Sequence, residues 1–168
     1  DIVRKVFQAN IAAIQDTLAV MNYEALAQAV ELLSSAERIL IVGVGTSAPI
    51  VMDMFNKLMR LGLNCRAQTD SYLQLMDAAL LSKRDVLVTV SQSGSSSDSV
   101  LTMEQASACG AMTICITGNA QSPITQYANV VLVSVSSETR PETLSSRIAQ
   151  ITIIDALYII LSMRDIDN

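Results

Sequence analysis

The hydrophobic positions of this chain follow two different rhythms, one before residue 37 and one after it. In the first part, apolar side chains recur at alternating intervals of four and three residues, the spacing of one face of an α-helix. This seam consists of Phe7, Ile11, Ile14, Leu18, Met21 and Ala25. We expect one helix over the first twenty-odd residues and a second over residues 23–33. The seam fits either packing on the domain's own core or a role in dimerisation or linkage.

After residue 37, short apolar runs rich in β-branched residues alternate with helical stretches. The clearest runs lie at residues 39–42, 85–90, 112–117 and 129–133, with a weaker candidate at residues 64–68. The helical stretches cover residues 48–61, 72–81, 96–109 and 146–163, with a short turn from Pro123. The apolar runs do not alternate with polar residues, as is typical of strands covered on both faces. The sequence therefore predicts a doubly wound α/β sandwich with parallel strands.

The helix expected at residues 48–61 has more apolar positions than one core-facing stripe requires. They are Ile50, Val51, Met52, Met54, Phe55, Leu58 and Met59. We expect part of this surface to meet a second subunit.

Composition limits the class of protein. The 168 residues are 51% hydrophobic, so the chain forms one domain that buries ~70% of its unfolded surface. Eleven basic residues stand against sixteen acidic ones, which gives a net charge of −5. The chain thus lacks the positive surface that binds a phosphate backbone, and we do not expect it to hold DNA or RNA by itself.

The ends of the chain indicate its location. Residues 1–5 are of mixed polarity, so we expect no signal peptide and a cytoplasmic protein. The chain starts without methionine, almost inside a helical pattern, which predicts a preceding segment. Residues 148–163 are interrupted by Gln150 and Asp155 and are shorter than a bilayer span of about 20 residues. We interpret them as a buried or interface helix.

The cysteines do not indicate a disulfide framework or a zinc site. Cys65, Cys109 and Cys115 are odd in number and far apart, and the chain contains no histidine. We expect reduced thiols in the core, no metal and no cofactor.

Two loops rich in glycine and hydroxyl groups follow expected strands. Gly43-Val-Gly-Thr-Ser47 follows the first strand, and Ser91-Gln-Ser-Gly-Ser-Ser96 follows the third. In a doubly wound sheet, loops beside the topological switch point form the ligand crevice. Each loop leads into a helix, whose free N–H groups and dipole favour an anion. Glycines at 43, 45 and 94 would let an anion approach the backbone.

The strength of such a site follows from its donors. Neither loop contains lysine or arginine, but each hydrogen bond to a charged group contributes about 1.5–3 kcal/mol and each helix terminus about 0.3–1 kcal/mol. Four or five donors could hold one phosphate, which fits a small phosphorylated metabolite better than a nucleoside triphosphate. The candidate hydroxyl donors are Thr46, Ser47, Ser91, Ser93 and Ser96.

Two other interpretations of the loops stay open. Thr46, Ser47 and Ser96 could simply cap helices. Capping explains less at Ser91 and Ser93, which lie before the expected start of the helix. Residues 43–48 also match the G-x-G-x-x-G/A pattern of dinucleotide-binding folds. Against that pattern, no acidic residue ends the strand at residues 64–68, and Asp70 lies just past it.

Together with Gly110-Ala111, Ile116-Thr117 and Ser122-Pro123, the two loops resemble the SIS (sugar isomerase) phosphosugar-binding domain. The resemblance narrows to the C-terminal effector domain of RpiR-type transcriptional regulators. The features that carry it are residues 145–151, residues 154–157 and the N-terminal helix that precedes the domain. The resemblance implies a three-layer, flavodoxin-like sandwich with a five-stranded parallel sheet over residues 37–168. It also implies that residues 1–36 form a helical linker or dimerisation segment packed on that domain.

For function, the resemblance implies a domain that senses a phosphorylated sugar or amino sugar, forms a homodimer or higher homo-oligomer, and modulates DNA binding by an upstream helix-turn-helix domain. The implied ligand-binding residues are Gly45, Thr46, Ser47, Ser91, Gln92, Ser93, Gly94 and Ser96. Within this set, Thr46 and Ser47 would contact sugar or phosphate, and the second loop would hold the phosphate. The family's usual threonine at position 96 is serine here, which keeps the hydroxyl.

An enzyme of the same fold is the alternative. Isomerases of this family place glutamate and histidine beside the phosphate site, and the reaction needs a base. This chain has no histidine and carries Ser95 where catalytic relatives often have glutamate, so we expect no catalysis. A phosphosugar isomerase or lyase would use Glu138 or Glu142 as its base. Glu138 could instead accept hydrogen bonds from sugar hydroxyls.

Overall fold

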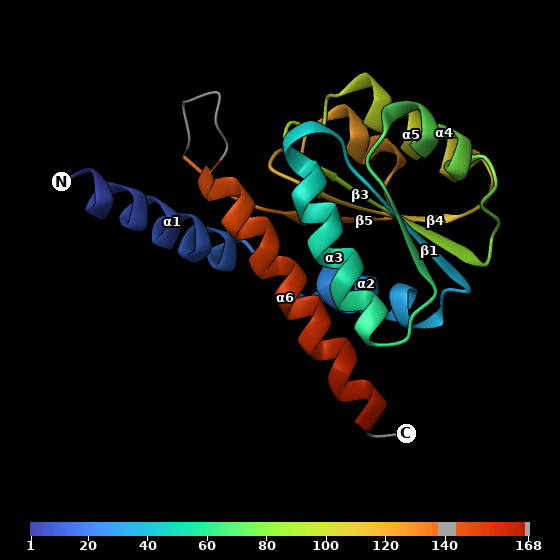
Figure 1. Cartoon of the computed structure of the whole chain (residues 1–168), viewed down its shortest axis with the longest axis horizontal. Coiled ribbons are helices and arrows are strands. Elements are labelled where there is room, and N and C mark those ends of the chain that lie inside the picture. The colour runs from blue at the N-terminus through green and yellow to red at the C-terminus, as the bar shows by residue number, and fades with distance from the viewer. Residues whose placement is uncertain (138–143, 167–168) are drawn as a thin grey trace.

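A five-stranded parallel sheet forms the centre of the computed structural model, which describes residues 1–137 and 144–166 (Figure 1). The strands are β1 (Arg38–Val42), β2 (Cys65–Gln68), β3 (Asp85–Ser91), β4 (Met112–Thr117) and β5 (Val130–Val133), in the order β2-β1-β3-β4-β5. The helices are α1 (Ile2–Ala19), α2 (Tyr23–Ser35), α3 (Ala48–Arg60), α4 (Ser71–Ala78), α5 (Ser97–Ala108) and α6 (Leu144–Ile166), with short 3-10 helices η1 (Gly45–Ser47) and η2 (Pro123–Tyr127). The predicted sandwich and all five predicted strands, including the weak candidate, are confirmed.

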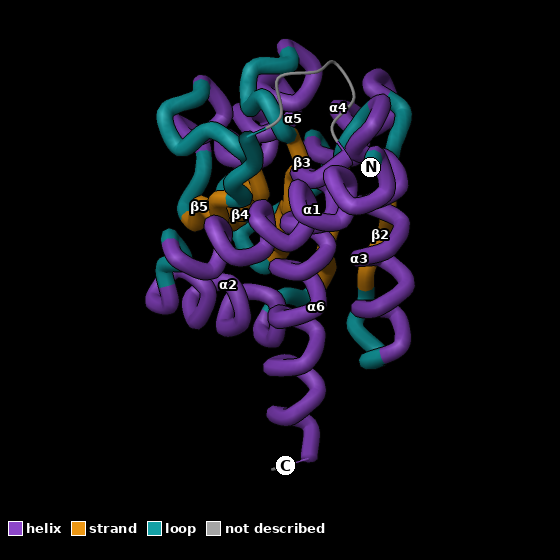
Figure 2. Tube along the Cα trace, turned by 90° about the vertical axis from the view of Figure 1, so that its left-hand side faces the viewer, coloured by secondary structure: helices purple, strands orange, loops and turns teal. Residues whose placement is uncertain are grey.

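Helices cover both faces of the sheet and create two hydrophobic cores (Figure 2). One face packs against α2, α3 and α6 through Ile39, Ile41, Val86, Val88, Val90, Ile114 and Ile116. The other packs against α4, α5 and η2 through Leu40, Val42, Leu87 and Cys115. Burial on both faces explains why the strands read as continuous apolar runs.

α6 belongs to the larger core. It is long and apolar enough to cross a membrane by length and composition alone. In the structure, however, one side of it is buried against the domain, through Ala149, Ile153, Ile154, Leu157 and Leu161. The prediction of a buried or interface helix at residues 148–163 is confirmed.

α1 projects from the body of the domain and packs along α6 (Figure 1). Its buried residues are Ala13 and Thr17. The Thr17 hydroxyl both donates to the carbonyl of Val135 (3.3 Å) and accepts from its N–H group (2.9 Å). These bonds fasten the end of α1 to the segment after β5.

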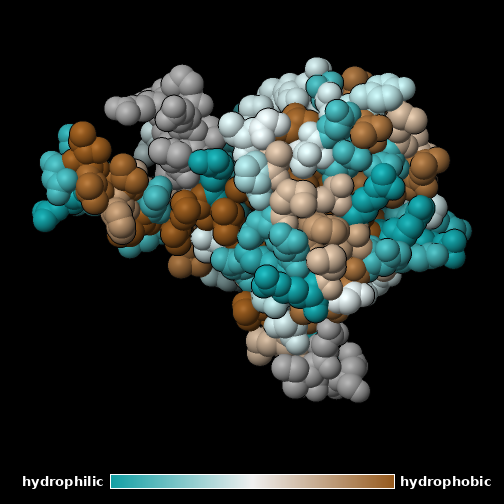
Figure 3. Space-filling view, viewed as in Figure 1, coloured by the Kyte–Doolittle hydropathy of each residue, from teal (hydrophilic) through white to brown (hydrophobic). Residues whose placement is uncertain are grey.

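The predicted seam divides in the structure: Met21 and Ala25 pack against the larger core, whereas its part on α1 is exposed. Phe7 is 65% exposed, Ile11 52% and Leu18 60%. Figure 3 shows hydrophobic side chains along the projecting part of the molecule. Contact with a second chain through this exposed part of the seam stays a prediction, as does a role as a linker.

α3 also has apolar residues on two sides. Ile50, Val51, Met54 and Leu58 are buried, whereas Met52 and Met59 are exposed. The prediction that this helix has more apolar surface than the core requires is confirmed.

The three cysteines are free thiols. Cys115 is buried in the smaller core, and burial raises its pKa to about 12. Burial also raises the pKa of Cys65.

Candidate functional site

The two predicted loops converge at the carboxyl edge of the sheet. β1 and β3 are neighbours, and their order in the sheet makes the gap between their ends the topological switch point. A cavity of about 420 Å³ lies there, within the usual size of small-molecule sites. It is lined by Val44, Thr46, Ser47, Val90, Ser91, Gln92, Ser93, Ser96 and Ser99.

Two helices start at the wall of this cavity. Ser47 directly precedes α3 and Ser96 directly precedes α5. Neither side chain makes a capping hydrogen bond. Both residues thus occupy the N-cap position without capping through their hydroxyls, which stay able to serve a ligand. The first turn of α5 adds free N–H groups. At the start of α3 the N–H groups of Ser47 and Ala48 donate to the carbonyls of Val44 and Gly45, and Pro49 has none.

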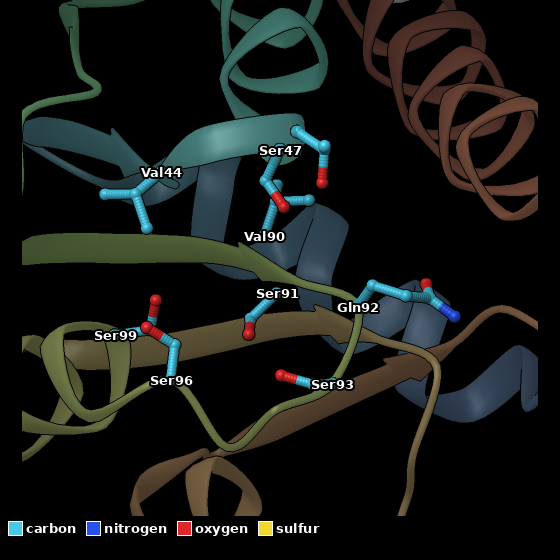
Figure 4. A pocket seen from close by; sticks show the side chains of 9 residues that line it. Val44, Ser47, Val90, Ser91, Gln92, Ser93, Ser96 and Ser99 are labelled. Carbon is cyan, nitrogen blue, oxygen red and sulfur yellow. The ribbon is translucent and has the colours of Figure 1, made fainter. Parts of the chain in front are cut away.

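The hydroxyls of Ser91 and Ser93 shape the second loop. The Ser91 Oγ accepts a hydrogen bond from the N–H group of Gly94 (3.1 Å), and the Ser93 Oγ accepts one from that of Ser95 (3.2 Å). A hydroxyl that accepts still has its own proton to donate. Figure 4 shows Ser91, Ser93 and Ser96 directed toward one shared space. That space has several donors to offer an anion.

The side chain of Gln92 points away from this space (Figure 4). Its amide oxygen accepts hydrogen bonds from the Nε2 of Gln150 in α6 (2.8 Å) and from the hydroxyl of Ser134 (3.4 Å). It lies so close to Gly118 that an added Cβ there would stand 2.1 Å from the Gln92 Nε2. Gln92 is thus held by the protein itself, and its backbone is the part left to face a ligand.

The glycines of the loops have more specific roles than predicted. A Cβ at Gly94 would lie 2.0 Å from the hydroxyl oxygen of Ser122, and one at Gly43 would lie 2.9 Å from a backbone oxygen of β3. Both positions therefore need glycine for packing within the protein, not primarily for an anion. Gly45 has a φ of +58° and open space at its Cβ position, so its requirement is the backbone conformation.

The cavity is polar, and none of the described residues that line it has a charged side chain. Its described lining consists of hydroxyl groups, one amide and two valines. Asp98 lies in the first turn of α5, but its side chain is exposed and outside the lining. Attraction for an anion must therefore come from the N-termini of α3 and α5 and from hydroxyl donors.

The dinucleotide interpretation does not fit this geometry. Its ribose would need the carboxylate of Asp70, but that carboxylate caps α4 by accepting from the N–H groups of Tyr72 (3.0 Å) and Leu73 (2.8 Å). Asp70 is thus already used by the fold.

The candidate bases Glu138 and Glu142 lie outside the described residues. Within residues 1–137 and 144–166, no group of three or more His, Cys, Asp or Glu side chains is placed to hold a metal ion. The role of Glu138 as a ligand contact stays a prediction.

Ser99 lines the cavity and was not among the predicted site residues. Its spacing gives the signal that would have identified it. It lies three residues after Ser96, and residues three apart are neighbours on the same side of a helix.

Comparisons with a family model and with known proteins agree on the family of this chain. A family model described as SIS domain matches residues 32–160. An uncharacterised HTH-type transcriptional regulator from Thermotoga maritima is 34% identical over 98% of this chain and 59% of its own length. The HTH-type transcriptional regulator RpiR from Escherichia coli K12 is 32% identical over 100% of this chain and 57% of its own length. The chain thus spans less than two thirds of these relatives.

A solved structure agrees with this assignment. The NanR protein of Vibrio vulnificus, complexed with ManNAc-6P, superposes with a TM-score of 0.90 and 26% sequence identity. The match covers 98% of this chain and 63% of that one.

Proposed function

Because the chain belongs to the SIS domain family, we propose that it is the phosphosugar-sensing effector domain of a transcriptional regulator. The observation that carries the proposal is the uncharged cavity at the switch point. Serine and threonine hydroxyls line it, and two helix N-termini open onto it. Such a site suits one phosphate group attached to a hydroxyl-rich body.

The phosphate binds at the second loop. Ser91, Ser93 and Ser96 supply hydroxyl donors there, and the start of α5 supplies N–H groups and a favourable dipole. Each hydrogen bond to the charged phosphate contributes about 1.5–3 kcal/mol, so these groups suffice without a basic side chain. The sugar then extends toward Thr46 and Ser47 on the first loop. The complex of NanR with ManNAc-6P supports a phosphorylated sugar or amino sugar as the ligand.

Regulation involves a segment beyond this chain. The regulators to which this chain is similar are longer than the chain, and their names describe them as HTH-type. DNA therefore binds through a helix-turn-helix domain upstream of α1, while residues 1–36 connect it to the sensor over residues 37–168. A phosphosugar can shift the arrangement of the DNA-binding domains only by its difference in affinity for the two states. We place this regulator in the cytoplasm.

The working unit is a homodimer or higher homo-oligomer. The exposed seam of α1 supports this assembly, as do Met52 and Met59 of α3. Contiguous exposed apolar surface on a domain of this size indicates an interaction site.

A thermal-shift panel tests the proposal. It contains hexose and amino-sugar 6-phosphates, N-acetylmannosamine 6-phosphate among them, with their unphosphorylated parents and NAD. A ligand at a hundred times its Kd stabilises by about 2.7 kcal/mol, which raises the Tm by about 5–10 °C for a domain of this size. We expect this shift for a phosphosugar and not for its parent or for NAD. A shift with NAD alone would contradict the proposal.

The same samples test the enzyme alternative, since the fold also occurs in phosphosugar isomerases. We expect the stabilising sugar phosphate to be recovered unchanged after incubation with the protein. Conversion to an isomer would show a catalyst instead of a sensor.

A further inference from the structure

Three polar side chains of the smaller core have no hydrogen-bond partner within the described residues. They are Gln74 in α4, Thr89 in β3 and Ser99 in α5. Both amide atoms of Gln74 are unpartnered, as are the two hydroxyls. Their exposed fractions are 0%, 0% and 1%. Burying a polar group without a partner is costly, and proteins do so rarely, so each of these groups needs an explanation.

The three residues lie in one layer of the fold. Ala78, Leu87 and Met103 belong to the smaller core on this face of the sheet. Gln74 lies one helical turn before Ala78 in α4, and Ser99 lies one turn before Met103 in α5. Thr89 lies two residues after Leu87, on the same face of β3. α4 and α5 both start at the carboxyl edge of the sheet, and β3 ends there. Each of the three polar residues therefore lies closer to that edge than its apolar neighbour. The polar layer therefore lies between the apolar core and the cavity.

Ser99 brings this layer to the cavity wall. It is a lining residue, and so is Ser91, which continues the Thr89 side of β3. Figure 4 shows the Ser99 hydroxyl beside Ser96 and on the side of the cavity where Val44 lies. The layer thus begins next to the phosphate-binding residues.

We propose that Ser99, the one of the three that lines the cavity, binds a hydroxyl group of the sugar and forms a neutral polar subsite, with Thr89 and Gln74 in the same polar layer. This subsite rests on the proposed function, in which the second loop holds the phosphate. Hydroxyl and amide groups each donate and accept, which matches a sugar hydroxyl. None of the three carries a charge that would bind a second phosphate or a carboxylate. The subsite therefore distinguishes one sugar from another, while the loop at residues 91–96 binds the phosphate.

Two variants test the subsite in the whole chain. Ser99→Ala removes one unpartnered hydroxyl, and Gln74→Met removes the amide at similar volume. Ser107→Ala, an exposed serine at the other end of α5, is the matched control. Without ligand, replacing an unpartnered buried polar group by an apolar one is neutral or stabilising, so we expect the Tm to stay equal or to rise by about 2 °C.

Binding is measured with the phosphosugar that stabilises the unmodified chain and with inorganic phosphate. We expect Ser99→Ala to weaken phosphosugar binding about tenfold, the effect of losing one hydrogen-bonded group. Gln74→Met should weaken it less, because Gln74 is fully buried and does not line the cavity. The affinity of both variants for inorganic phosphate stays equal to that of the unmodified chain. The Ser107→Ala control changes neither.

Four other results would contradict the proposed subsite, each for a different reason. An equal loss for inorganic phosphate would assign Ser99 to the phosphate site. A lower Tm in both variants without ligand would indicate that the groups hold an internal water molecule. Unchanged phosphosugar affinity would leave the subsite without a role, although the proposed function would stand. If the unmodified chain binds no phosphosugar, the proposed function fails and the subsite fails with it.

Discussion

The side-chain oxygen of Gln92 accepts a 2.8 Å hydrogen bond from the Nε2 of Gln150, which ties the loop after β3 to α6. The same oxygen accepts from Ser134 at the end of β5. The next residue, Val135, exchanges two hydrogen bonds with Thr17 of α1. A continuous set of contacts therefore leads from the loop after β3 to the helix at the start of the chain. In the proposed function, the upstream DNA-binding domain attaches at this helix, α1.

We predict that Gln150→Leu weakens phosphosugar binding about tenfold and lowers stability by about 1 kcal/mol. Gln92 loses its closest hydrogen-bond donor, so the loop between residues 91 and 96 is held less firmly. Titration calorimetry and urea denaturation measure the two effects. Thr152→Ala, at an exposed position of the same helix, is the control and should change neither. Normal affinity in Gln150→Leu would show that the contact does not position the loop.

Ser91→Ala should abolish stabilisation by the phosphosugar while the fold survives. The variant loses a hydroxyl that faces the cavity and that also closes the loop onto Gly94. Ser95→Ala is a matched control, since this serine belongs to the same loop but is exposed and does not line the cavity. Thermal shift with and without ligand compares the two. An unchanged shift in Ser91→Ala would mean that the phosphate binds elsewhere.

The sheet and the loops could be predicted because their signals are local. Buried parallel strands are apolar on both faces, so the runs at residues 85–90 and 112–117 stand out from the sequence. The serines between residues 91 and 96 follow such a strand directly. Their position at the carboxyl edge then follows from the fold class.

The direction of single side chains could not be predicted in the same way. Gln92 turns toward Gln150, which lies 58 positions further along the chain, so no neighbouring residue reveals the contact. Gln74 looks like an ordinary surface residue of a helix, but it is fully buried where α4 packs against the rest of the domain. The seam of α1 has the spacing of a core-facing helix, but the domain covers a different side of it. Long-range packing decides each of these cases.

Gly94→Ala should destabilise the protein more than a change of backbone conformation alone. The glycine has a φ of +64°, and its Cβ would overlap Ser122 at 2.0 Å. Gly62→Ala is the control, because Gly62 has a similar φ of +75° and open space at its Cβ position. We expect a loss of about 1 kcal/mol for Gly62→Ala and about 3 kcal/mol for Gly94→Ala by urea denaturation. Equal losses would contradict the packing role of Gly94.

The double variant Phe7→Glu, Ile11→Glu should convert the assembly to monomers. Both side chains are more than half exposed on α1, so the substitutions cost little in the separate chain but place charges in an apolar contact. Light scattering coupled to size-exclusion chromatography measures the mass. Leu80→Glu, at a 70% exposed residue after α4, is the control and should leave the assembly intact. A monomeric unmodified chain would refute the role of the seam.

The last prediction concerns the pair of Arg38 and Asp85, which are register neighbours across β1 and β3. The Asp85 carboxylate is 1% exposed and accepts hydrogen bonds from Arg38 Nη2 (2.6 Å) and from the N–H group of Ser82 (2.7 Å). Burial alone would raise the pKa of Asp85. The hydrogen bonds from Arg38 and Ser82 outweigh it and lower the pKa below its ordinary value.

A carboxyl group whose pKa is lower in the folded state stabilises the fold above its unfolded pKa of about 3.9 and loses that contribution as the pH falls through the folded pKa. Asp85→Asn should therefore cost about 2 kcal/mol at pH 7, because the ion pair is lost and its buried partners are less well satisfied. The difference from the unmodified chain should shrink below about pH 4, as protonation removes the same charge from Asp85.

Urea denaturation at pH 7, 5, 4 and 3 follows this difference. Glu37→Gln provides the control, since the pair of Glu37 and Arg84 has side chains that are 52% and 70% exposed. An exposed pair contributes about 0–1 kcal/mol, so this variant should follow the unmodified chain at every pH. If the Asp85→Asn difference stayed constant down to pH 3, the stabilisation would come from the shape of the side chain. If it shrinks as expected, the stabilisation comes from the ionised carboxylate at the start of β3.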